Sequence, residues 1–116
     1  MGKLTTHVLD TAQGKPGAGI SVRLFRVTGD GRELIKVTST SSDGRTGAPL
    51  LDENSFAGGT WELEFDVAAY FAGQSVALAD PPFLDRVTLR FSTAADEHYH
   101  VPLLVSPWSY STYRGS

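Results

Sequence analysis

The chain of 116 residues contains no cysteine. This absence excludes a disulfide framework, a thiolate zinc site, an iron–sulfur cluster and a cysteine nucleophile. Runs of one charge are also lacking, and ten basic against thirteen acidic residues give a net charge of −3. We therefore expect neither electrostatic binding to nucleic acid nor attachment to an acidic membrane surface.

Long apolar segments are missing as well. No stretch approaches the roughly eighteen apolar residues of a transmembrane helix, and residues 1–10 lack the basic start and apolar run of a secretory signal. A cytoplasmic location is the resulting expectation. A content of 41% hydrophobic and 20% charged residues is typical of globular proteins, and the length fits one domain over residues 1–116.

Turn residues divide the chain into short segments in which apolar and polar residues alternate. Such alternation indicates strands with one buried face. The expected strands cover residues 4–9, 20–27, 34–40, 61–65, 87–91, 99–105 and 108–113. Glu62 and Glu64, in the fourth of these, are expected to face outwards. This spacing predicts an all-β antiparallel sandwich.

Residues 67–72 break the alternation and predict a single short helix. Asp66 is expected to cap its first N–H groups, and Gly73, which tolerates the left-handed conformation, is expected to end it. We interpret this helix as a connection between two strands.

Histidine supplies the main candidates for chemistry. His7 shares a strand face with Thr5 and Leu9, where it is either an ordinary strand histidine or a functional one. His98 and His100 are two residues apart, so their imidazoles point the same way from Cα atoms about 6.6 Å apart. This spacing suits two metal ligands or an acid–base pair, and equally two polar residues on a solvent-exposed face.

Arg45 lies on a tight turn between Gly44 and Gly47. A guanidinium on such a turn is either solvated or aimed at an anion or a polarised carbonyl. Ser116 ends the chain near Arg114, either as a frayed terminus or as part of a site. The sequence has no Gly-x-Ser-x-Gly elbow, glycine-rich phosphate loop or calcium loop, so a serine hydrolase triad is not expected.

Four blocks of the sequence follow one another in a familiar order. They are Leu4–Asp10 with the turn at 14–17, Asp43–Arg45, His98–Leu104 with 106–112, and Tyr113–Ser116. Together these blocks resemble the transthyretin-related family over nearly the whole chain. The terminal Tyr-Arg-Gly-Ser resembles the tetrapeptide that marks the enzyme branch, the 5-hydroxyisourate hydrolases. Trp108 departs from the family pattern, which often has tyrosine there, but it keeps an aromatic ring.

The resemblance implies a two-sheet sandwich of about eight strands with one short helix. It further implies a homotetramer, a dimer of dimers, with active sites in a channel where the dimers meet. The implied reaction is hydrolysis of 5-hydroxyisourate to 2-oxo-4-hydroxy-4-carboxy-5-ureidoimidazoline in urate degradation, without a metal or other cofactor. By match to the family motifs, the catalytic residues are His7, Arg45 and His100, and the substrate-binding residues are His98, Tyr113, Arg114, Gly115 and Ser116.

Histidine suits the proton steps of amide hydrolysis because its ordinary pKa is about 6.5. Our hypothesis gives these steps to His7 and His100, with the identity of the base left open, and gives Arg45 the stabilisation of substrate and oxyanion. Two alternatives remain. One is a non-catalytic carrier of a small ligand, and the other is a zinc hydrolase in which His7, His98 and His100 bind the metal.

Overall fold

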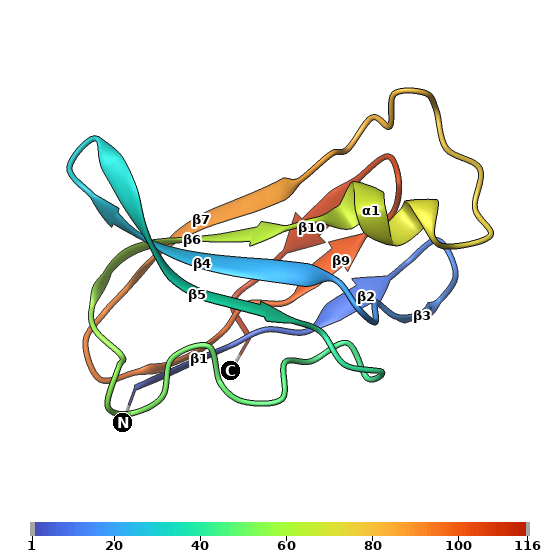
Figure 1. Ribbon diagram of the computed structural model, residues 1–116. Coiled ribbons are helices and arrows are strands. Elements are labelled where there is room, and N and C mark those ends of the chain that lie inside the picture. Colours follow the sequence, from blue (N-terminus) through green and yellow to red (C-terminus); the bar gives the residue numbers. More distant parts are fainter. Residues whose placement is uncertain (1, 116) are drawn as a thin grey trace.

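The computed structural model describes residues 2–115 as two layers of β-strands with one short helix (Figure 1). The strands are β1 (Lys3–Thr5), β2 (Val8–Asp10), β3 (Lys15–Pro16), β4 (Ser21–Thr28), β5 (Gly31–Ser39), β6 (Gly59–Phe65), β7 (Val87–Thr93), β8 (His98–His100), β9 (Leu103–Val105) and β10 (Tyr110–Thr112). Helix α1 (Val67–Ala72) follows β6. The predicted all-β sandwich with a short helix is confirmed.

One layer is a four-stranded antiparallel sheet in the order β5–β4–β6–β7. The other layer consists of the sheet β10–β9–β2–β3 and the pair β1–β8. Backbone hydrogen bonds from Val101 N to Thr5 O and from Leu103 N to His7 O, each 2.9 Å long, link the pair to the sheet. The second layer is therefore one interrupted sheet.

The interruptions divide two strands that the alternation predicts as continuous. Residues 4–9 divide into β1 and β2, and residues 99–105 divide into β8 and β9 around Pro102, which has no N–H to donate. The pairs β1–β8 and β2–β9 are parallel. The expectation of an antiparallel sandwich is therefore wrong for these two pairs. Each pair joins a strand near the start of the chain to one near its end, and this long connection allows the parallel direction.

The core lies between the layers and takes alternate residues from the facing strands. Its fully buried side chains include Leu4, Val8, Val22, Leu24, Trp61, Leu63, Phe65 and Leu103. Successive residues of a strand point to opposite faces. Burial of Leu4 and Val8 therefore turns Thr5 and His7 away from the core, as the alternation predicts.

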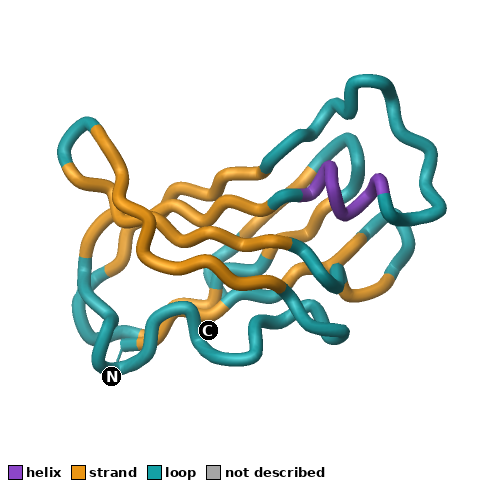
Figure 2. The backbone as a smooth tube through the Cα atoms, in the orientation of Figure 1, coloured by secondary structure: helices purple, strands orange, loops and turns teal. Residues whose placement is uncertain are grey.

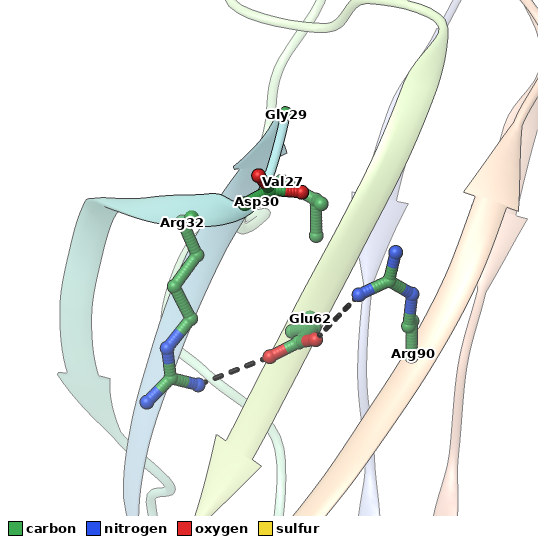
Figure 3. Close-up of a pocket in the computed structure, with 7 residues that line it drawn as sticks. Val27, Gly29, Asp30, Arg32, Glu62 and Arg90 are labelled. Atoms are coloured by element: carbon green, nitrogen blue, oxygen red, sulfur yellow. Dashed lines mark hydrogen bonds and ion pairs between the residues drawn. The ribbon is translucent and has the colours of Figure 1, made fainter.

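The two glutamates of β6 lie among arginines. Figure 3 shows the Glu62 carboxylate between Arg32 and Arg90, at 3.0 and 3.1 Å. Glu64 contacts Arg32 at 3.2 Å and is only 6% exposed. Both glutamates lie on the face of β6 opposite the buried Leu63 and Phe65, as expected, but the arginines that contact Glu64 shield it from solvent.

Strand β5 is exposed, whereas residues 34–40 were expected to have one buried face. Leu34, Ile35 and Val37 are 50%, 41% and 57% exposed. β5 is the last strand of its sheet, and its hairpin with β4 extends beyond the neighbouring strands (Figure 1). Alternation in the sequence does not reveal such an edge position.

Helix α1 has the predicted bounds without the predicted caps. Asp66 makes no side-chain capping hydrogen bond, and Ala68 N instead donates to Asp85 O at 3.0 Å. Gly73 has a φ of −87°, so the helix ends without a left-handed residue. The loop carbonyl replaces the expected side-chain cap.

A buried hydrogen bond fastens α1 to the second layer. The Tyr70 hydroxyl donates to the carboxylate of Asp10 in β2 at 2.7 Å. Figure 2 shows the helix and the long loop after it at one end of the sandwich. Within residues 2–115, no helix has the length and apolar character needed to span a membrane.

Candidate active site

The pairing of β1 with β8 brings Thr5 beside His100. The strands are parallel, with Lys3 opposite His98 and Thr5 opposite His100. Paired residues of neighbouring strands project from the same side of a sheet, so Thr5, His98 and His100 share one face. Tyr99, at 8% exposure, is turned to the other face. The common orientation predicted for the two histidines is thus present.

Arg45 lies on a turn that contains several internal hydrogen bonds. The carboxylate of Asp43 accepts from the Ser41 hydroxyl at 2.7 Å and from Arg45 N at 3.0 Å. These hydrogen bonds hold the pKa of the Asp43 carboxyl below its usual value. Gly44 has a φ of +80°, and a Cβ there would clash with the carbonyl of Val8, so the turn requires glycine.

The same turn fixes the tautomer of the neutral His7 ring. This residue lies between β1 and β2 and forms an isolated antiparallel bridge with Arg45. Its Nε2 is 2.9 Å from the carbonyl oxygen of Asp43. Because a carbonyl only accepts, Nε2 carries the proton, and Nδ1 of the neutral ring is unprotonated.

A hollow of about 430 Å³ is lined by Thr5, Arg45, His98 and His100. Arg45 and His98 are exposed, whereas Thr5 and His100 are half-buried. His7 lies beside this site hollow, within electrostatic range of His100. The structure therefore gathers Arg45, His98 and His100 around one space, with His7 next to it.

The environment of His100 favours its neutral form. Burial lowers the pKa of His100, and the charges of Arg45, His7 and His98 lower it further. A lowered pKa keeps the imidazole unprotonated at neutral pH and able to accept a proton. Its Nδ1 lies 2.8 Å from the Thr5 hydroxyl oxygen.

The terminal tetrapeptide is divided between two places. Gly115 N donates to the carbonyl of His100 at 2.7 Å, and a Cβ on Gly115 would lie 2.8 Å from His100 Cδ2. Only glycine allows this close approach. Tyr113 and Arg114 instead line a second hollow of about 380 Å³ between β7, β8 and β10.

Within one chain, Arg114 is directed away from the site hollow. Its guanidinium lies 4.1 Å from the ring centre of Tyr99 and donates to the carbonyl of His98 at 3.3 Å. Ser116, also predicted to bind substrate, lies outside the described residues. Among the described residues of the tetrapeptide, Gly115 lies against the ring of His100, whereas Arg114 contacts only the backbone carbonyl of His98.

The histidines do not form a zinc site within residues 2–115. A catalytic zinc ion needs about three protein ligands at once. In this part of the chain, no group of three or more His, Cys, Asp or Glu residues is arranged to hold a metal ion. The zinc alternative therefore lacks a donor set there.

Two groups at the site, Thr5 and the backbone carbonyl of Asp43, were not predicted from the sequence. Thr5 shares the strand face of His7, and this signal is visible in the sequence, but its contact with His100 depends on the pairing of β1 with β8. Asp43 acts through its backbone carbonyl, which no residue pattern indicates. Both roles arise from contacts between distant segments.

The chain resembles known proteins over nearly its whole length. The family model described as "HIUase/Transthyretin family" matches residues 4–115. A 5-hydroxyisourate hydrolase of Deinococcus radiodurans is 63% identical over 114 residues, which cover 97% of this chain and 95% of that protein.

Solved structures share the fold. A crystal structure of (S)-allantoin synthase has a TM-score of 0.92 at 44% identity over 99% of this chain, which spans only 44% of that chain. Sea bream transthyretin in complex with thyroxine has a TM-score of 0.86 at 28% identity, covering 97% of this chain and 94% of that one. Both the family model and the hydrolase relative extend across the sandwich and its site, and the chain belongs to the HIUase/transthyretin family.

Proposed function

We propose that the protein hydrolyses 5-hydroxyisourate to 2-oxo-4-hydroxy-4-carboxy-5-ureidoimidazoline, a step of urate degradation. The observation that carries the proposal is the hollow lined by Arg45, His98 and His100, with His7 beside it. It combines a fixed positive charge with imidazole side chains, which are able to accept and donate protons. The Deinococcus radiodurans relative, named a 5-hydroxyisourate hydrolase, supports the choice of substrate.

Opening a ring amide requires a nucleophilic water, a stabilised oxyanion and a protonated leaving nitrogen. Between them, His7 and His100 take the proton from water as its oxygen bonds to the carbonyl carbon, and deliver a proton to the ring nitrogen as the C–N bond breaks. Arg45 keeps its charge throughout, so it orients the polar ring and stabilises the carbonyl oxygen. His98 and the segment Tyr113–Ser116 contact the substrate.

The proposal includes the setting of the reaction. Residues 1–116 form one domain, four copies assemble as a dimer of dimers, and the active sites lie in the channel between dimers. The exposure of Arg45 supports assembly, and so does the position of Tyr113 and Arg114, which line a different hollow from Arg45, His98 and His100 in a single chain. The reaction takes place in the cytoplasm and needs no metal ion.

A carrier of a small ligand is the second candidate. The similarity to sea bream transthyretin, solved with thyroxine, favours it. An apolar ligand, however, is held mainly by apolar and aromatic side chains. A cation and three histidines at one place are better suited to hydrolysis.

The test adds purified protein to freshly prepared 5-hydroxyisourate and follows the ultraviolet decay. We expect decay much faster than without protein, and unchanged after dialysis against EDTA. Decay at the spontaneous rate, together with saturable binding of a small ligand, would favour the carrier. Loss of activity with EDTA that zinc restores would contradict the metal-independent reaction.

A further inference from the structure

The Thr5 hydroxyl lies between the two imidazoles of β8. Its Oγ1 is 2.8 Å from Nδ1 of His100 and 3.4 Å from Nε2 of His98. Thr5 pairs with His100 in the parallel register of β1 and β8, and it lines the same hollow as both histidines. One side chain therefore contacts both rings from the neighbouring strand.

A hydroxyl has one proton to donate and lone pairs with which to accept. Thr5 thus either donates to Nδ1 of His100 or accepts from it, and the two arrangements belong to different tautomers of the neutral ring. His7 has no such choice, because its partner is a carbonyl oxygen. The state of His100 therefore depends on the orientation of one hydroxyl.

We propose that Thr5 is a positioning residue that holds neutral His100 with its proton on Nδ1, so that Nε2 is free to accept a proton from the attacking water. This inference rests on the proposed hydrolysis. In this arrangement Oγ1 accepts from His100 Nδ1–H and donates its own proton to Nε2 of His98. His98 contributes by fixing the orientation of the hydroxyl. Within residues 2–115, Nε2 of His100 has no hydrogen-bond partner.

The hydrogen bond to Thr5 becomes stronger as the reaction proceeds. When water gives a proton to Nε2 and its oxygen bonds to the carbonyl carbon, His100 becomes an imidazolium with both nitrogens protonated. The bond from Nδ1–H to Oγ1 is then charge-assisted, and such bonds are roughly twice as strong as neutral ones. Nε2 passes its proton to the ring nitrogen as the C–N bond breaks, which restores the starting tautomer.

Other groups around His100 favour its neutral form without selecting a tautomer. They are Arg45 from the turn, His7 from between β1 and β2, and His98 from β8 itself. A substitution at Thr5 leaves these charges in place. It removes the acceptor that stabilises the imidazolium, so the pKa of His100 is expected to fall further.

The test uses the full chain with three variants. Thr5→Val removes the hydroxyl at nearly constant shape, and Thr5→Ser keeps it. Thr60→Val is the matched control, because Thr60 is also a strand threonine and its hydroxyl lies 3.3 Å from that of Ser92, on β7. Long-range ¹H–¹⁵N spectra above the titration of His100 report the tautomer. We expect Nδ1–H in the unsubstituted chain, Thr5→Ser and Thr60→Val, and a shift towards Nε2–H in Thr5→Val.

Kinetics provide the second readout. We expect Thr5→Val to lower kcat at least about tenfold with KM changed less than about twofold, because proton transfer and not substrate contact is impaired. The acid limb of its pH profile moves to lower pH. Thr5→Ser recovers kcat to within about threefold of the unsubstituted chain.

An Nε2–H tautomer in the unsubstituted chain overturns the inference, as does a Thr5→Val protein with unchanged tautomer and kcat. If the unsubstituted chain does not hydrolyse 5-hydroxyisourate, the proposed function fails, and the spectra still decide whether Thr5 sets the tautomer. Should Thr5→Val fail to fold by circular dichroism, the tautomer of the unsubstituted chain and the kcat of Thr5→Ser remain decisive.

Discussion

The two histidines that we propose as catalytic contact different neighbours. The carbonyl of Asp43 fixes the tautomer of His7, whereas His100 faces the Thr5 hydroxyl and the charge of Arg45. Each partner lies on a different segment from the histidine that it affects. At the scale of single residues, the chemistry therefore depends on contacts and not on residue type alone.

Replacement of either histidine by asparagine tests the proton steps. His7→Asn and His100→Asn keep a polar side chain but cannot carry a proton near neutral pH, so we expect kcat to fall by roughly 10²- to 10⁴-fold. Folding should be preserved, because neither side chain belongs to the apolar core. The ultraviolet assay measures the rate and circular dichroism the fold. Retention of about a third of the activity in a variant would remove that histidine from the mechanism.

The pH dependence follows from the lowered pKa of His100. Its ordinary value is 6.5, and burial together with Arg45 lowers it. The neutral ring is the proposed active form. We therefore expect kcat/KM to be constant above pH 6.5 and to fall as the pH decreases from 6.5 towards the lowered pKa of His100.

Stability should change in the same pH range. The unfolded chain, in which His100 has its ordinary pKa, binds the proton first, so the free energy of unfolding also decreases as the pH falls. Urea titrations of the unsubstituted chain and His100→Asn check this, and identical pH dependences would contradict it.

At the scale of elements, α1 is held in place by a contact with β2. Asp10 is fully buried and accepts from the Tyr70 hydroxyl and the Gln13 side chain at 2.7 and 2.8 Å. Burial raises the pKa of Asp10, but these hydrogen bonds, together with those from the backbone N–H groups of Gln13 and Ala12, outweigh it and leave the pKa below its usual value. The helix thus depends on a charge-assisted bond as well as on apolar packing.

A double-mutant cycle measures this contact. Tyr70→Phe should lower the free energy of unfolding by about 1–3 kcal/mol, because it removes a hydrogen bond to a buried carboxylate. Asp10→Asn should also destabilise the protein, and the double variant should lose less than the sum of the two. Urea denaturation provides the values. Strictly additive losses would mean that the two side chains are not coupled.

The terminal segment Tyr113–Ser116 is either an ordinary chain end or part of the active site, and the two interpretations predict opposite effects of its deletion. An ordinary frayed end tolerates deletion. Because Gly115 lies against His100, we expect deletion of Tyr113–Ser116 to abolish hydrolysis while the sheet signal in circular dichroism is retained. A folded truncated chain within about threefold of full activity would exclude the tetrapeptide from the site.

At the scale of the whole molecule, each four-stranded sheet within residues 2–115 ends in two edge strands. β5 and β7 are the edges of one four-stranded sheet, and β10 and β3 are the edges of the other. Such edges invite pairing with a second copy. We expect static light scattering to give about four times the chain mass of 12.5 kDa at micromolar concentration. A monomer mass would contradict the tetramer and the active site between dimers.

Local alternation and turn chemistry were enough to predict the all-β class, the bounds of α1 and the face on which His7 lies. They were also enough to orient His98 and His100 together, since the side-chain period of a strand is a local property. The motif blocks supplied the family and the candidate residues.

Only the tertiary structure decided the parallel pairing of β1 with β8, the edge position of β5 and the burial of Glu64 under arginines. It also decided that Thr5 contacts His100. Tyr113 and Arg114 line one hollow, whereas His100, which Gly115 contacts, lines another. These features depend on which distant segments meet. Residue spacing specifies the face of each strand, but the strand that lies beside it is selected by packing of the whole core.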